Sequence, residues 1–134
     1  MNGRPFWKDS VSGCMTRRPP ENSTNISEIY DLLYQLGLTA STTGFFHTAY
    51  AVYLAIQQPE RLLLVSRWLY PAVARHYATT WMLVERSIRT AADVAWSTNA
   101  GLLENLARHA LYQAPKVSKF ISILALHFSL HLAA

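Results

Sequence analysis

The chain has 134 residues and a mass of 15.1 kDa, a length typical of one domain with a short appendage. Hydrophobic residues make up 51% of the sequence, which excludes global disorder, whereas the 15% of charged residues leave few charges to cover a surface. The 12 Lys and Arg and the 8 Asp and Glu give a net charge of +4, which permits an acidic or nucleic-acid partner without requiring one.

The cysteine count and the hydropathy pattern bear on the cellular compartment. Cys14 is the single cysteine, so an internal disulfide and a cysteine-based zinc site are excluded, and a reducing compartment is favoured. Residues 1–8 contain no apolar run of signal-peptide length. The most apolar stretch, residues 120–134, is shorter than the about 20 residues that a membrane span needs. We therefore expect a cytoplasmic protein without a membrane segment.

The N-terminal residues differ in composition from the rest of the chain. Residues 1–24 are rich in proline, glycine and small polar residues, include Arg17-Arg18, and show no sustained apolar period. We predict a flexible tail over residues 1–24 and one helical domain over residues 25–134. Because much of the positive charge lies in the tail, the helical domain is nearly neutral.

Apolar residues at helical spacing recur along the whole of the predicted domain. Asn25 is expected to cap the first helix, with Glu28 completing a capping box, and Gly37 is expected to end it. No segment shows the strict alternation of a half-buried strand, so we predict an all-α domain of six to seven helices. The predicted helices cover residues 26–36, 43–57, 60–70, 71–77, 80–97, 102–112 and 118–132.

Two of these segments have the spacing of a helix-turn-helix. The first is short and offers the small residue Ala74 where a second helix can cross closely, and Ala78-Thr79 breaks the chain before the second helix. At 100° per residue, the buried stripe of the second helix consists of Val84, Ile88, Ala91 and Ala95. The opposite face carries Met82, Leu83, Arg86, Arg89, Thr90 and Asp93, with Glu85 at its edge.

The charged residues of this face allow two interpretations. Arg86 and Arg89 project together from the half of the helix that enters a major groove, where an arginine fork matches guanine O6 and N7. Thr79 or Thr80 can cap the helix, whose free N–H groups then face a phosphate. Alternatively, Glu85 and Arg89, four residues apart, form an ordinary surface ion pair.

A longer motif around this helix resembles a known family. Residues 79–97 read Thr-Thr, then Val-Glu-Arg-x-Ile-Arg and Val-Ala-Trp, and are similar to the recognition helix of the C-terminal DNA-binding domain of the sporulation response regulator family, stage zero sporulation protein A. The similarity covers roughly residues 29–131 and includes Leu69-Tyr70-Pro71, Gly37 and Gly44, and Pro115-x-x-Ser118. The resemblance implies a six-helical domain that binds a short promoter box under the control of a phosphorylated receiver domain.

The chain departs from the family pattern at two points. Met82 and Leu83 stand where that pattern has a polar residue and an arginine, so one charged contact is missing and the exposed face is more apolar. The 24 residues of the predicted tail are too short to hold a receiver domain, so we expect regulation without a phosphorylation switch.

The sequence thus predicts a sequence-specific DNA-binding transcription regulator whose partner is double-stranded DNA. Base edges would be read by Glu85, Arg86 and Arg89, and the DNA backbone would be contacted by Arg75, His76, Thr79, Thr80 and Trp81. The alternative is a protein-interaction or dimerisation module on the same fold that has lost DNA reading and modulates a related regulator. The near-neutral domain and Leu83 favour this alternative, whereas the Glu85, Arg86 and Arg89 set opposes it.

The remaining candidate features predict no catalytic or metal chemistry. His127 and His131 share a helix face but have no third ligand nearby, so we interpret them as core or interface histidines rather than a metal site. No catalytic triad, phosphate loop or carboxylate pair is present, so no enzyme, cofactor or small-molecule substrate is predicted.

The C-terminal helix predicts self-association. Its apolar residues fall on every side, which favours a homodimer through residues 120–132, the alternative being a fully buried helix in a monomer. These residues are Phe120, Ile121, Ile123, Leu124, Leu126, Phe128, Leu130 and Leu132.

Overall fold

Helices make up the regular structure of the part of the chain that the computed structural model describes, residues 25–133, with side chains described to Ser129. No strand occurs within this part, so the all-α class is confirmed. It contains five α-helices rather than six to seven, together with a 3-10 segment (η1) and a π-helical segment (η2). The predicted tail, residues 1–24, lies outside the described residues. The elements are α2 (Ile26–Gln35), α3 (Thr43–Gln57), η1 (Pro59–Leu64), η2 (Val65–Leu69), α4 (Tyr70–His76), α5 (Trp81–Ala107) and α6 (Val117–Ala133).

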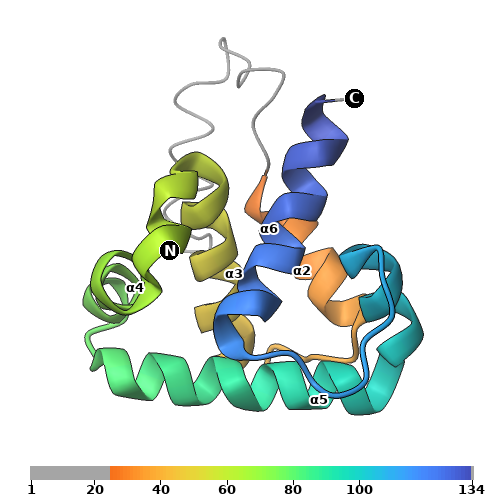
Figure 1. Ribbon diagram of the computed structural model, residues 1–134. Coiled ribbons are helices and arrows are strands. Elements are labelled where there is room, and N and C mark those ends of the chain that lie inside the picture. The colour runs from red at the N-terminus through yellow and green to blue at the C-terminus, as the bar shows by residue number, and fades with distance from the viewer. Residues whose placement is uncertain (1–24, 134) are drawn as a thin grey trace, which may run out of the picture.

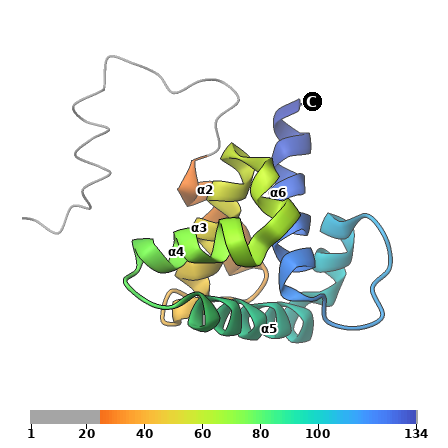
Figure 2. The same cartoon turned by 60° about the vertical axis from the view of Figure 1, so that its left-hand side comes forward.

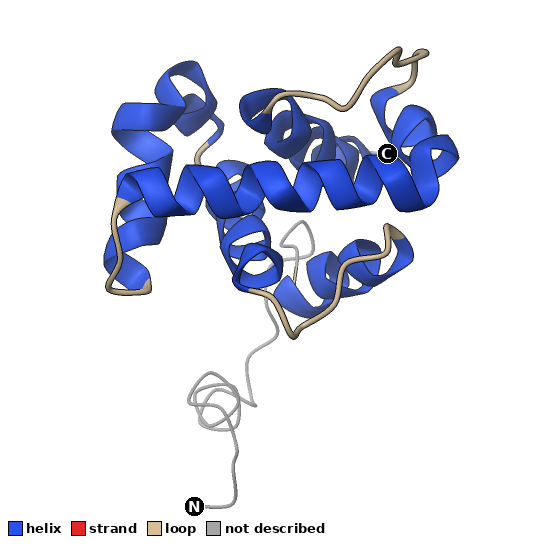
Figure 3. Cartoon of the chain, turned by 90° about the horizontal axis from the view of Figure 1, so that it is seen from below, coloured by secondary structure: helices blue, strands red, loops and turns tan. Residues whose placement is uncertain are grey.

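The long helix α5 forms one side of the molecule, and the other helices lie on its inner side (Figure 1). α3 packs against both α5 and α6, α2 packs against α3, and α4 packs against α5. The view from below shows α5 running across the molecule with its outer face uncovered by other helices (Figure 3). Figure 2 shows α4 lying above one end of α5, so the short helix and the long helix are neighbours in space.

Side-chain caps and one glycine set several helix ends as predicted. The Asn25 side chain accepts a hydrogen bond from Ser27 N (3.0 Å) at the start of α2. Thr80 Oγ1 accepts from Leu83 N (3.3 Å) and caps α5. Gly37 follows α2 with φ of 96°, a conformation that glycine adopts without steric cost.

Two predicted helix boundaries are wrong. The expected α-helix over residues 60–70 is instead η1 followed by η2, and Leu64 between them leaves helical geometry (φ −141°, ψ 78°). The predicted helix over residues 102–112 is the second half of α5 and ends at Ala107 rather than at residue 112, whereas the predicted interruption between residues 97 and 102 is present at Asn99 (φ −150°, ψ 63°). The physical reason is that Asn99 replaces helical hydrogen bonds, because its side chain donates to Gln35 O (3.0 Å) and accepts from Leu102 N (3.2 Å).

A close approach between α3 and α5 fixes the position of the long helix. A Cβ atom added at Gly44 would lie 2.5 Å from the backbone oxygen of Ser87, so only glycine fits there. One turn further along α3, buried His47 makes a hydrogen bond between Nδ1 and Ser87 Oγ (2.6 Å). Because the Ser87 hydroxyl donates its single proton to Val84 O (3.0 Å), His47 Nδ1 is the donor of this bond.

The first prediction concerns this glycine. Gly44→Ala should lower the free energy of unfolding by about 1–3 kcal/mol, since the added methyl group must push α3 and α5 apart. Gly101→Ala is the matched control, because a Cβ there would have nothing within 4 Å and should leave stability unchanged or slightly raised. Urea unfolding followed by circular dichroism measures both variants. Equal stability of the two variants would contradict the close approach.

The second prediction concerns pH. Burial lowers the pKa of His47 below its ordinary value of 6.5, whereas the unfolded chain binds the proton near 6.5. The free energy of unfolding should therefore be highest above pH 6.5 and fall as the pH decreases through 6.5 towards the pKa of the folded state. His47→Gln keeps a hydrogen-bond donor towards Ser87 but cannot titrate. Urea unfolding on both sides of pH 6.5 should show a smaller decline for this variant, and an identical decline would contradict the assignment.

Candidate DNA-binding surface

A tight turn between α4 and α5 completes the predicted helix-turn-helix. Ala78 has φ of 56°, and Thr79 N donates to Ala74 O (2.9 Å), so the chain reverses directly after α4. The left-handed conformation of an alanine costs about 1 kcal/mol, which the packing of the two helices must offset. The cap at Thr80 then starts α5 beneath α4 (Figure 1).

The buried and exposed faces of α5 agree with the predicted periodicity. Its buried stripe is fully covered and comprises Val84, Ile88, Ala91 and Ala95. The opposite face forms an exposed ridge that comprises Met82, Leu83, Arg86, Arg89, Thr90 and Asp93, with the half-exposed Glu85 at its edge. The charged side chains of this ridge can therefore reach a partner without unfolding of the domain.

An ion pair distinguishes the two arginines of the ridge. Arg89 Nη2 lies 3.1 Å from Glu85 Oε2, and the two side chains are 56% and 34% exposed. Such an exposed pair contributes at most about 1 kcal/mol, so it orients Arg89 without locking it. Arg86, by contrast, has no ion-pair partner among the residues that the structure describes. The surface ion pair between Glu85 and Arg89 is thus confirmed, whereas base reading by Arg86 and Arg89 stays a prediction.

Two grooves run along the flanks of the ridge. The first has a volume of about 420 Å³ and lies between α5 and the loop that joins α2 to α3. Leu83, Arg86 and Thr90 line it on the helix side, and threonine hydroxyls line it on the loop side, from Thr39, Thr42 and Thr43. The second has a volume of about 510 Å³ and lies between α5 and the start of α6. Its lining includes Trp81, Glu85, Arg89, Asp93, Lys116 and Ser118.

Tyr70 of α4 forms part of the wall of the second groove. Its side chain is buried, and burial, helped by Glu85 and opposed by Arg89, raises the pKa of its hydroxyl to about 12. The hydroxyl therefore stays neutral at physiological pH beside the Glu85 and Arg89 pair. Tyr70 adds a polar wall without adding charge.

Most of the predicted backbone-contact residues gather at the start of α5. Thr79 lines the first groove, Thr80 is exposed, and Trp81 lines the second groove with 42% of its surface exposed. The two residues at the end of α4 are exposed but differ in their surroundings. The His76 ring stacks on Tyr50 with a centroid distance of 4.0 Å, and Arg75 lines a separate cavity.

Sequence reasoning missed the residues that other segments contribute to the grooves. Lys116 and Ser118 reach the second groove from the start of α6, and the threonines of the loop before α3 reach the first. The Pro115-x-x-Ser118 motif lies at the start of α6 and was the sequence feature that could have indicated Lys116 and Ser118. Spacing along α5 alone could not indicate these residues, because they meet α5 only in the folded chain.

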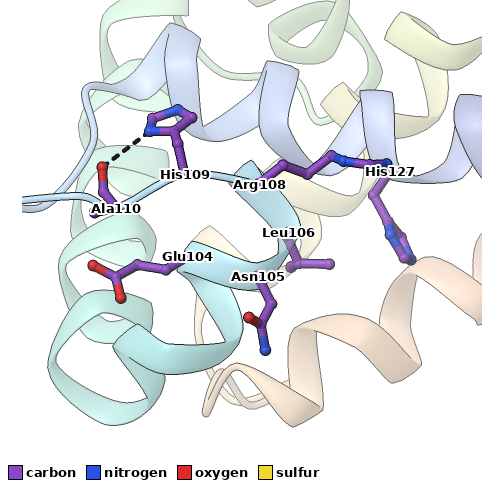
Figure 4. A pocket seen from close by; sticks show the side chains of 7 residues that line it. All are labelled: Glu104, Asn105, Leu106, Arg108, His109, Ala110 and His127. Atoms are coloured by element: carbon purple, nitrogen blue, oxygen red, sulfur yellow. Dashed lines mark hydrogen bonds between the residues drawn. The ribbon is translucent and has the colours of Figure 1, made fainter.

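His109 and His127 line another cavity, of about 740 Å³. Figure 4 shows that the side chains of Glu104, His109 and His127 do not converge on one point, and His109 Nδ1 bonds Ala110 O (2.9 Å). Among the described residues, no cluster of three His, Cys, Asp or Glu could hold a metal ion. The side chain of His131 lies outside the described residues.

The apolar residues of α6 are largely covered within one chain. Phe120, Ile121, Ile123, Leu124 and Phe128 are buried, whereas Leu126 is 55% exposed. The side chains of Leu130 and Leu132 lie outside the described residues. Between residues 120 and 128, Leu126 is thus the main apolar side chain that a second copy of the chain would cover. The homodimer stays a prediction. None of the described helices is both long and apolar enough to cross a bilayer.

The comparison with known families agrees with this geometry. A family model described as sporulation initiation factor Spo0A C terminal matches residues 29–128, which include the helix-turn-helix and both grooves. This family is a DNA-binding domain of a transcription regulator and not a family of enzymes. By this match over most of its length, the chain belongs to the family of C-terminal domains of the sporulation initiation factor.

Proposed function

We propose that the chain regulates transcription by reading a specific DNA sequence with the N-terminal half of α5. The observation that carries this proposal is the exposed ridge of α5, on which Arg86 and the Glu85 and Arg89 pair lie between two grooves. A ridge of this kind fits a major groove, and the grooves beside it leave room for the two phosphate strands.

Each charged residue at the N-terminal half of the ridge is proposed to make a different base contact. Arg86 is proposed to donate two hydrogen bonds to guanine O6 and N7, since its guanidinium has no competing carboxylate among the described residues. Arg89 is proposed to read a second base in the orientation that Glu85 imposes. Glu85 keeps a free lone pair for a cytosine amine, because its ion pair with Arg89 uses one oxygen.

The grooves are proposed to receive the DNA backbone. On one side Thr79, Thr39 and Thr43 line the wall with hydroxyl groups, and on the other side Trp81, Lys116 and Ser118 line the wall. Thr80 caps α5, whose first N–H groups favour a phosphate nearby. Arg75 and His76 are proposed to contact phosphates where α4 crosses the backbone.

The third prediction tests base reading. A preferred site is first selected from a pool of randomised duplexes, and binding of the chain and its variants is then measured by fluorescence anisotropy. Arg86→Gln should weaken binding to the selected site by about 1–3 kcal/mol and relax the choice of one base pair, because the guanine contact is lost. Lys119→Gln is the matched control, because this exposed lysine of α6 lines neither groove. Equal effects of the two substitutions would contradict base reading by α5.

One observation favours the second candidate function, a protein-interaction module that has lost DNA reading. Trp81, Met82 and Leu83 are consecutive, apolar and 42%, 60% and 47% exposed at the start of the recognition helix. A patch of this kind suits a protein partner better than a phosphate backbone. The two candidate functions differ in what they predict for a new charge at this place.

The fourth prediction separates the two candidates. Leu83→Arg adds a cation in the first groove beside Arg86, so it should raise duplex affinity and steepen the dependence of log K on log salt by about 0.9 units if α5 lies in a DNA groove. Tyr112→Arg is the control, because it adds the same charge at an exposed residue that lines neither groove. If affinity and salt slope match those of the control, α5 faces a protein partner instead.

Self-association is proposed to use the exposed side chain of Leu126 and the last turns of α6. The projection of this helix beyond the other helices supports the proposal (Figure 1).

A further inference from the structure

A second surface, away from the ridge of α5, combines positive charge with exposed apolar side chains. A cavity of about 480 Å³, which we call the arginine pocket, is lined by Gln58, Glu60, Arg61, Arg67, Trp68 and Arg75. We propose that the arginine pocket binds an acidic segment of a partner protein that also carries apolar side chains. The pocket shares no residue with either groove, and because Arg75 is also a proposed contact of the DNA backbone, the test relies on Arg67 and Trp68.

The charge of the pocket favours an anionic ligand. Three guanidinium groups face one carboxylate, that of Glu60, in a domain that is otherwise nearly neutral. Guanidinium groups bind carboxylates through two parallel hydrogen bonds, which makes arginine more selective for such ligands than lysine. The concentration of three arginines in one cavity therefore indicates recognition of carboxylates or phosphates.

One of the three arginines is already held in place. Arg61 Nε donates to Gln58 Oε1 (2.7 Å), and Arg61 Nη1 donates to the backbone oxygen of Trp68. These bonds link η1 to the end of η2 and fix the guanidinium at the pocket before a ligand arrives. A pre-positioned group loses less conformational entropy on binding. Arg67 and Arg75 are exposed and can adjust to the ligand.

Exposed apolar side chains on the same segments distinguish a protein from DNA as the partner. Trp68 lines the pocket and is 44% exposed, while Leu63 and Leu64 of η1 are 75% and 46% exposed. A phosphate backbone would leave these leucines in water, whereas a peptide with alternating acidic and apolar residues would satisfy the guanidinium groups and cover the leucines together. Val65 and Ser66 of η2 line the second groove, whereas Leu63, Leu64 and the pocket residues Arg67 and Trp68 line neither groove and lie outside the proposed DNA contact.

The experiment uses the full chain and a labelled synthetic peptide of alternating glutamate with leucine or phenylalanine. Two further peptides serve as probes: one has glutamine for each glutamate, and one has serine for each apolar residue. Fluorescence anisotropy should show binding of the first peptide and, for each of the other two, binding weaker by about tenfold or more. Arg67→Gln and Trp68→Ala should each weaken binding of the first peptide to a similar extent, whereas Lys119→Gln should not.

Unfolding curves establish that both variants fold, and the exposed Arg67 provides the informative variant if Trp68→Ala loses stability. Peptide binding that is unchanged by Arg67→Gln, or equal for the serine peptide, would overturn the proposal. A third result would also overturn it: the parent chain does not bind the peptide, and Arg67→Gln lowers the affinity for the duplex. The pocket would then be a contact for the DNA backbone. Arg86→Gln should leave peptide binding intact, so failure of the DNA-binding proposal and failure of this one are distinguishable.

Discussion

The close approach of α3 to α5 is the constraint on which the rest of the structure depends. Gly44 has no side chain, so α3 reaches the backbone of α5 at Ser87, and the hydrogen bond from His47 to Ser87 Oγ fixes the rotation of the long helix there. Because α3 also packs against α6 and α2, every other helix takes its position from this crossing. A buried polar bond between two helices is costly to break, which makes the seating of α5 specific.

The opposite end of α5 is held by a second set of contacts. A Cβ at Gly37 would collide with the side chain of Thr98, and Asn99 donates to the last carbonyl of α2 at Gln35. The long helix is thus fixed near Ser87 by α3 and near Thr98 by α2. Its outer face is left free of helix packing, which is why charged and apolar side chains can share one ridge between two grooves.

The sequence predicted local structure well where one helix contributes all the information. The bounds of α3, the caps at Asn25 and Thr80 and the buried stripe of α5 follow from periodicity and capping chemistry, which act within a few residues. The break at Asn99 falls between the helices predicted to end at residue 97 and to begin at residue 102, although its partner Gln35 lies in another helix and could not be indicated by spacing. The end of α5 at Ala107 was missed because spacing does not indicate the left-handed conformation of Arg108 (φ 66°), after which Glu104 Oε2 accepts from Leu111 N (2.9 Å).

The candidate site shows the same division between local and long-range information. Glu85, Arg86 and Arg89 could be placed on one face from spacing alone, and the structure adds that Glu85 pairs with Arg89. Lys116, the loop threonines and the arginine pocket depend on how distant segments meet, so spacing could not reveal them. The separation of Arg75 from the ridge is likewise a property of the folded chain.

Mapping the DNA contact on the folded domain tests the central claim most directly. Amide chemical shifts of the isotope-labelled chain can be followed by nuclear magnetic resonance while a selected duplex is added. Our account predicts that the largest changes occur in residues 79–94 and in the two loops that line the grooves, while η1 changes little. Changes concentrated in η1, η2 or α6, with residues 79–94 unaffected, would contradict it.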